Sequence, residues 1–133
     1  MKRTLTAIAI TGMSFLFVAT KATAGDGLTI PTTVGELYNA CLKVEGNKPM
    51  YGEDMFYGGY CLGIIQGWRR ELEMNCVFER NNPLVNKADV LDASPIALAQ
   101  AFINYAKDNP QAWDRLGLGG LTAAFQEYFP CTK

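Results

Sequence analysis

The sequence predicts an all-α domain of four to five helices, a small helical bundle that is stapled by disulfide bonds. In several segments apolar residues recur at intervals of three and four, which is the period of an amphipathic helix. No segment shows convincingly the alternation of apolar and polar residues that is typical of a β-strand. Four cysteines in a chain of 133 residues supply the cross-links.

The first 24 residues read as a cleavable signal peptide. Lys2 and Arg3 form a positively charged start, and an apolar run follows over residues 5–19. Small residues then end the segment at Ala22-Thr23-Ala24, as signal peptidase requires. The run has about 15 residues, fewer than the roughly 20 of a membrane-spanning helix, which is the alternative. We therefore expect export to the periplasm and a single mature domain over residues 25–133.

The first helix of the mature chain is expected to begin after Thr33. Thr33 and Glu36 form a capping box, in which the hydroxyl caps the helix and the glutamate reaches back to the cap residue. Its apolar face continues at helical spacing through Val34, Leu37, Cys41 and Val44. A loop over residues 45–54 should separate it from a longer helix over about 55–74.

Three glycines recur every four residues in this longer helix, at Gly59, Gly63 and Gly67. Each glycine costs a helix interior about 1 kcal/mol relative to alanine. Three of them on one face therefore suggest that another helix backbone approaches closely there. Polar residues in the same segment, such as Arg69 and Arg70, exclude the membrane version of this motif.

A third helix should follow a second loop over residues 75–92. Ser94 is its expected N-cap, and Pro95 occupies the first helical position, where its missing N–H costs nothing. The residues expected to point inward are Leu98, Ala101, Phe102 and Tyr105.

The last part of the chain predicts a short helical piece and a final helix. The short piece is expected over residues 111–116, and the glycine-rich residues 117–120 should break it. The final helix is expected over about 121–129, and Pro130 should end it.

The expected helix geometry narrows the disulfide pairing. If the first two helices are antiparallel, Cys41 and Cys61 lie at similar heights near the loop between them. Cys61 and Cys76 are about 22 Å apart along one helix, so they cannot pair directly. Cys76 lies at the far end of that helix, which disfavours pairing with Cys41. The expected bonds are therefore Cys41–Cys61 and Cys76–Cys131.

Several kinds of chemistry lack their residues in this sequence. The chain has no histidine, which excludes imidazole catalysis and His-ligated metal sites. No C-x-x-C pair is present for a zinc or thioredoxin-like site, so we expect no metal and no cofactor. Catalysis by carboxylates alone is the remaining alternative, with Glu53-Asp54 and Glu71/Glu73 as candidates. Because solvated surface charge explains both pairs better, we expect no catalytic residues and no enzyme.

The charge of the mature chain favours a protein partner with a basic surface. Three of the 12 basic residues and none of the 13 acidic residues precede residue 25, so the mature net charge is −4. Since the only basic pair of the mature chain is Arg69-Arg70, nucleic acid and anionic membranes are poor partners. We expect the partner to contact the irregular, acidic segments at six residues: Glu53, Asp54, Tyr57, Phe78, Glu79 and Arg80.

A series of short motifs runs through almost the whole mature chain. E-L-Y-N-A-C-L-K at residues 36–43 precedes Y-C-L-G-I-I-Q-G at residues 60–67; N-C-V, D-N-P and a terminal E-Y-F-P-C follow. This order, together with the signal peptide, resembles the Rap/Tai immunity family. Members of that family protect bacteria against amidase effectors of type VI secretion.

The resemblance implies a small, all-helical periplasmic protein with two disulfides, often a homodimer. It also implies a binding partner, a peptidoglycan amidase effector whose active-site cleft the protein blocks without catalysis of its own. Residues 45–55 and 77–92 depart from the family pattern, so we expect them to select the partner. A periplasmic stress chaperone is the alternative, but such a protein needs a surface that opens in acid, which two staples and zero histidines make harder.

Expression with the native leader should give a periplasmic protein that begins at Gly25. Mass spectrometry of the intact protein from the periplasmic fraction measures this directly. A dominant species that retains residues 5–19 would contradict the expected export.

Overall fold

Four α-helices and two short 3₁₀-helices make up the described part of the chain. A computed structural model describes residues 28–44, 49–79, 81–82, 84 and 86–131. The α-helices are α1 (Val34–Cys41), α2 (Glu53–Phe78), α3 (Pro95–Asp108) and α4 (Gly117–Tyr128). The 3₁₀-helices are η2 (Leu42–Val44) and η3 (Pro110–Ala112). The all-α class expected from the sequence is confirmed.

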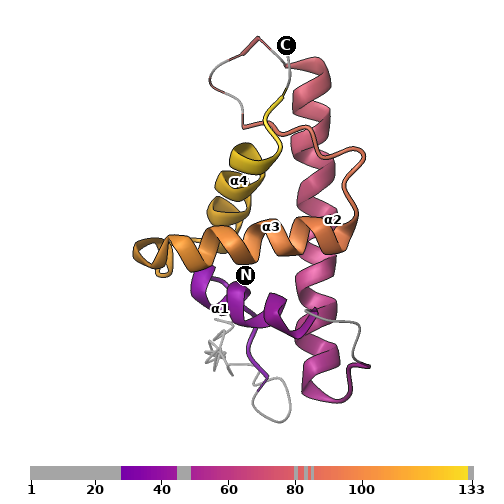
Figure 1. The fold of residues 1–133 in the computed structure, drawn as a ribbon, viewed down its shortest axis with the longest axis vertical. Helices are drawn as coiled ribbons and strands as arrows, with labels where there is room; N and C mark the ends of the chain where they lie inside the picture. Colours follow the sequence, from indigo (N-terminus) through magenta and orange to yellow (C-terminus); the bar gives the residue numbers. More distant parts are fainter. Residues whose placement is uncertain (1–27, 45–48, 80, 83, 85, 132–133) are drawn as a thin grey trace, which may run out of the picture.

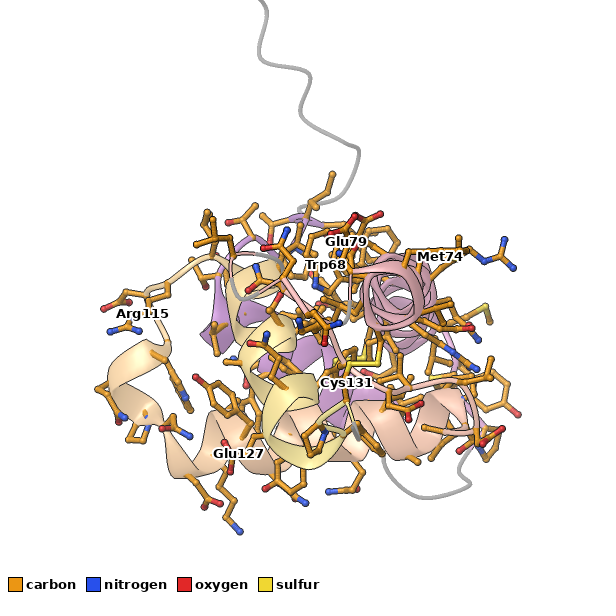
Figure 2. All side chains as sticks on the ribbon, turned by 90° about the horizontal axis from the view of Figure 1, so that it is seen from above. Trp68, Met74, Glu79, Arg115, Glu127 and Cys131 are labelled. Atoms are coloured by element: carbon orange, nitrogen blue, oxygen red, sulfur yellow. A yellow bond between two sulfur atoms is a disulfide. The ribbon has the colours of Figure 1, made fainter. Side chains whose placement is uncertain are left out.

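The long helix α2 forms one side of the bundle, and α1 and α3 cross it (Figure 1). Each of the four α-helices contacts the other three. Seen along α2, the other helices lie to one side of it, so its opposite face is open to solvent (Figure 2). No helix in the described residues has the combination of length and apolar character that a membrane span needs.

The hydrophobic core lies where the four helices meet. Cys61, Ile65 and Leu72 supply the buried stripe of α2. Phe102 of α3 and Phe125 of α4 are the largest fully buried side chains. Burying a side chain of this size contributes about 1.5–3 kcal/mol relative to exposure, which makes this packing the main stabilising term. Tyr105, which the sequence pattern also places inward, is only partly buried.

Two helix starts form as the sequence predicts. The Thr33 hydroxyl accepts a hydrogen bond from the Glu36 N–H, and the Glu36 carboxylate accepts one from the Thr33 N–H. Ser94 caps α3 by accepting from the Ala97 N–H at 3.1 Å, with Pro95 as the first helical residue. These bonds satisfy N–H groups that have no partner inside the helix.

The final helix begins at Gly117, earlier than expected, because α1 passes closely over its first turn. The Val34 N–H donates to the Arg115 carbonyl at 2.9 Å, and the Gly117 N–H donates to the Thr32 carbonyl at 2.8 Å. A Cβ atom on Gly120 would lie 2.5 Å from Cγ2 of Val34. The prediction that residues 117–120 interrupt the helical structure before the final helix is wrong, since they form the first turn of α4, where Gly117 and Gly120 lie against α1.

Two further boundaries differ from those expected. α2 extends beyond residues 55–74 at both ends, so Glu53 and Asp54 form its first turn instead of a loop. Carboxylates in a first turn interact favourably with the helix dipole, which supports the earlier start. The short piece expected over residues 111–116 is a single 3₁₀ turn, because the chain then pairs with the segment before α1 through the Thr33–Leu116 bridge.

The glycine strip of α2 faces solvent. Gly59, Gly63 and Gly67 are all exposed, and a Cβ atom on any of them would meet nothing within 4 Å beyond its own helical neighbourhood. No helix of the described residues approaches the strip, so the expected close packing is wrong for this part of the chain. The buried stripe of α2 lies on the opposite face, so the glycines leave its outer surface smooth.

Both disulfides join the expected cysteines. Cys41–Cys61 links the end of α1 to α2, with the Cα atoms 5.1 Å apart. Cys76–Cys131 links the end of α2 to the last described residue, with the Cα atoms 5.9 Å apart. The antiparallel arrangement assumed for the first two helices is wrong, since α1 crosses α2 (Figure 1). The pairing still forms because α1 ends against α2.

Alanine substitutions at two glycines should shift stability in opposite directions. Gly63→Ala should raise the free energy of unfolding by about 0.5–1 kcal/mol, because alanine favours the helix and meets no neighbour. Gly120→Ala should lower it by about 1–3 kcal/mol, because Val34 and Phe102 would have to move. Urea unfolding at neutral pH measures both. A loss of stability in Gly63→Ala would mean that a helix packs on the strip in solution.

Candidate partner-binding surfaces

A pocket of about 260 Å³ opens between α1, the first turns of α2 and the segment before α1. Three residues of α1 and one of η2, spaced i, i+3, i+4 and i+7, form one wall, and two residues of α2 spaced i, i+4 form the other. Such spacings place side chains on one face of a helix. We call it the amino-end pocket, and its lining is Thr29, Pro31, Glu36, Asn39, Ala40, Lys43, Glu53 and Tyr57.

Two tyrosines of α2 hold the segment before α1 in place beside this pocket. The Tyr57 hydroxyl accepts a hydrogen bond from the Thr29 N–H at 3.3 Å. The Tyr60 hydroxyl donates to the Pro31 carbonyl at 3.0 Å. The Cys41–Cys61 disulfide fixes α1 against the same stretch of α2. The walls of the amino-end pocket are therefore tied together by covalent and hydrogen bonds.

Two charged groups of the amino-end pocket are engaged by neighbours. The Lys43 ammonium lies 2.7 Å from the Asp54 carboxylate, and the hydrogen bond with Asp54 raises the pKa of Lys43. The Glu36 carboxylate accepts hydrogen bonds from the backbone N–H groups of Thr32 and Thr33, at 2.9 and 3.0 Å. These bonds lower the pKa of Glu36 from 4.5 to about 2, so Glu36 is negatively charged throughout the physiological range.

A second surface lies at the other end of α2. Met74, Val77 and Phe78 share one helix face, and Met74 points away from the bundle (Figure 2). Phe78 is 72 % exposed, and Leu84, in the loop that follows, is 91 % exposed. We call Met74, Val77, Phe78 and Leu84 the carboxy-end ridge. Exposed apolar residues that share one helix face, as Met74, Val77 and Phe78 do, are typical of interaction sites.

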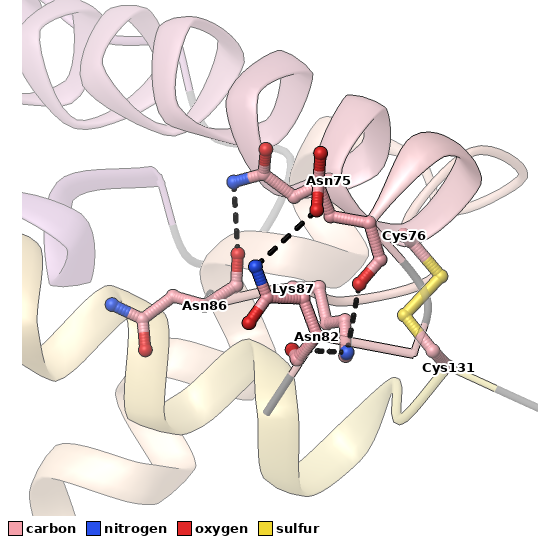
Figure 3. The surroundings of a disulfide bond; sticks show 7 residues. Asn75, Cys76, Asn82, Asn86, Lys87 and Cys131 are labelled. Atoms are coloured by element: carbon pink, nitrogen blue, oxygen red, sulfur yellow. Dashed lines mark hydrogen bonds between the residues drawn. A yellow bond between two sulfur atoms is a disulfide. The ribbon is translucent and has the colours of Figure 1, made fainter. Parts of the chain in front are cut away.

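The chain beneath this ridge is anchored to α2 at several points (Figure 3). The Cys76–Cys131 disulfide holds the C-terminal segment against the last turn of the helix. The Asn75 side-chain amide donates to the Asn86 carbonyl at 2.9 Å. The Ala88 N–H then donates to the Leu72 carbonyl at 3.3 Å, so the returning chain runs alongside α2.

A lysine closes the carboxyl end of α2. The Lys87 ammonium donates to the carbonyl groups of Glu79 and Asn82, at 3.0 and 2.8 Å (Figure 3). A cation at this end of a helix also interacts favourably with the helix dipole. The Asn82 side-chain oxygen accepts a hydrogen bond from the Leu84 N–H at 3.0 Å, which fixes the backbone beside the exposed leucine. These bonds anchor the backbone at the end of α2, beside the ridge.

The six residues predicted to contact a partner fall into two groups. Glu53 and Tyr57 line the amino-end pocket, and Asp54 pairs with Lys43 beside it. Phe78 and Glu79 lie at the opposite end of α2, about 37 Å away along a helix that rises 1.5 Å per residue. Arg80 lies outside the described residues. The two groups therefore belong to separate surfaces.

Sequence reasoning missed residues of both surfaces, although signals for them were present. A polar face next to the apolar stripe of α1 could have been predicted from the helical spacing of Glu36, Asn39 and Lys43. Met74 and Val77 were missed because the helix was expected to end at residue 74. Once α2 continues to residue 78, the same period places them on the outer face.

The comparisons with known proteins agree with this structure. The family model of the Rap1a immunity proteins matches residues 33–131, which is most of the chain and includes all four cysteines. The chain therefore belongs to the Rap1a immunity protein family, as its resemblance to the Rap/Tai proteins implied. No curated protein and no solved structure shows a significant match. Members of this family bind a cognate effector protein, are typically periplasmic and are generally non-catalytic.

Acidification should destabilise the native protein more than a Glu36→Gln variant. The native pKa of Glu36 is about 2, below its ordinary 4.5, so its stabilising effect is complete above pH 4.5 and is lost as the pH falls toward 2. Glutamine cannot show this titration. Urea midpoints measured at pH 7 and pH 3 should therefore fall less in the variant, and an equal fall would assign the acid sensitivity to other groups.

Proposed function

We propose that this protein confers immunity to a type VI secretion effector by binding a peptidoglycan amidase and occluding its active-site cleft. Membership of the Rap1a family supports immunity to such an effector. The observation that carries the mode of action is the carboxy-end ridge, a set of exposed apolar side chains on an anchored protrusion. The protein acts by stoichiometric binding in this proposal, with one chain per toxin chain.

The shape of the ridge suits a cleft. The end of α2 projects beyond α3 and α4 (Figure 1). Active sites are concave and mostly apolar, so the complementary surface is a projection that carries apolar groups. Phe78 and Met74 belong to the residue types that are enriched at the centres of protein interfaces.

The anchoring of the ridge suits tight binding. Ordering a flexible side chain or loop on association costs about 0.5–1.5 kcal/mol for each immobilised side chain. Lys87, Asn75 and the Cys76–Cys131 disulfide supply that order in the free protein. A toxin must be neutralised at low concentration, which requires high affinity. A surface that is already ordered loses less free energy on binding and so favours high affinity.

The proposed place of action is the periplasm. A peptidoglycan amidase acts outside the inner membrane, so a protector must reach the same compartment. The residues before Gly25 carry the features of a leader peptide that would deliver it there. Two disulfides are typical of proteins that fold in an oxidising compartment of this kind.

A double variant of the ridge tests the proposal. Cells that express the cognate amidase in the periplasm should survive with the native protein and die with Phe78→Ala/Leu84→Ala. With purified proteins, the double variant should weaken inhibition by at least about 100-fold, because two exposed anchors are removed. Ile96→Ala is the matched control, since Ile96 is a 54 % exposed aliphatic residue of α3 that is remote from the ridge. An unchanged inhibition constant in the double variant would move the interface elsewhere.

The location of action is tested in the same cells. Deletion of residues 2–24 should abolish protection, and a heterologous leader on residues 25–133 should restore it. Protection by the leaderless form, or the absence of inhibition of any amidase from the same genome, would contradict the immunity proposal and favour a periplasmic chaperone.

A further inference from the structure

We infer that the amino-end pocket is a second recognition site, which receives the guanidinium group of an arginine side chain from a partner protein. The pocket is formed by α2, by α1 with η2 and by the segment before α1, and its residue Tyr57 lies about 25 Å along α2 from Met74 of the carboxy-end ridge. The inference concerns this pocket alone, so it stands whether or not the ridge enters an amidase cleft.

The charge balance of the pocket favours a cation. The described residues of its lining carry two carboxylates, Glu36 and Glu53, and one ammonium, Lys43. The ammonium lies 2.7 Å from the Asp54 carboxylate, which compensates its charge. Among the described residues of the pocket, the carboxylates of Glu36 and Glu53 are therefore left without a compensating cation at salt-bridge distance. A positively charged group that enters the pocket gains Coulomb energy, which screening by water reduces but does not remove.

The acceptors in the lining of the pocket come from two helices. The hydrogen bonds that Glu36 accepts from Thr32 and Thr33 all end on Oε2, which leaves Oε1 as an acceptor among the described residues. The Asn39 side-chain carbonyl comes from the next turn of α1, and the Glu53 carboxylate comes from α2. A guanidinium group carries five N–H donors in one plane, so a single arginine can use acceptors on both walls.

The setting favours arginine over lysine. The pocket is partly apolar, with Pro31 and Ala40 buried in its lining. Phe56 packs edge-on against Tyr57 of the lining, with the ring centroids 5.2 Å apart. A guanidinium group is more weakly hydrated than an ammonium group and stacks on aromatic rings, so it loses less on entering such a site. A volume of about 260 Å³ leaves room for the head group and part of its stem.

Titration with small arginine analogues tests the inference on the mature protein. The probes are the Nα-acetyl amides of arginine, of lysine and of citrulline, the last being the neutral analogue of arginine. NMR spectra of ¹⁵N-labelled protein should show saturable shifts with the arginine probe at residues 36–43 and 53–57. The lysine probe should bind at least about threefold more weakly, and the citrulline probe should give no saturable shift.

Two matched variants separate the pocket from general surface charge. Glu53→Gln should weaken binding of the arginine probe by at least about fivefold, because it removes the carboxylate of the α2 wall. Glu127→Gln removes an exposed carboxylate of α4 and should leave binding unchanged. Urea unfolding confirms that both variants remain folded. Three results would each overturn the inference. They are binding of the lysine or the citrulline probe as tight as that of the arginine probe, equal effects of the two variants, and no saturable shift with the arginine probe.

Discussion

The attachment of α2 to the rest of the chain by two disulfides is the constraint on which both surfaces depend. Cys41–Cys61 holds α1 against the amino-terminal half of α2, and the amino-end pocket lies between these two helices. Cys76–Cys131 holds the C-terminal segment at the other end, beneath the carboxy-end ridge. A domain of about 100 residues buries a modest core, so cross-links of this kind add stability that packing alone supplies less readily.

One residue of α1, Glu36, has several structural roles. Glu36 caps the helix, fixes the backbone of the preceding segment and lines the amino-end pocket. The first turn of α1 also packs on the start of α4, where Gly117 and Gly120 permit the close approach. The wall of the amino-end pocket that α1 forms is thus positioned by the contacts of α1 with α4.

The length of α2 decides how the two surfaces can be used. A standard interface buries about 800 Å² on each partner, a patch roughly 30 Å across. Tyr57 of the amino-end pocket and Met74 of the carboxy-end ridge are about 25 Å apart along the helix, so a compact partner centred on one surface does not cover the other. The open glycine strip lies between them, where Gly59, Gly63 and Gly67 present no side chain to a partner. The two ends of α2 can therefore contact different parts of a partner, or different partners.

The sequence by itself determined the elements of this protein. The Thr33 and Ser94 caps, the apolar stripes and the cysteine spacing led to four of the helices and to both disulfides, because these signals act over a few residues or along one helix. The angle between helices was not predictable in this way, since it depends on side chains that meet from distant segments. For that reason the sequence pattern predicted wrongly which glycines contact another helix. A small residue permits close packing, but only the tertiary structure decides whether a neighbour is there. Gly117 and Gly120 have such a neighbour in α1, and the strip on α2 has none within the described chain. The tertiary structure likewise separated Glu53, Asp54 and Tyr57 from Phe78 and Glu79, because the helix between them continues without a break.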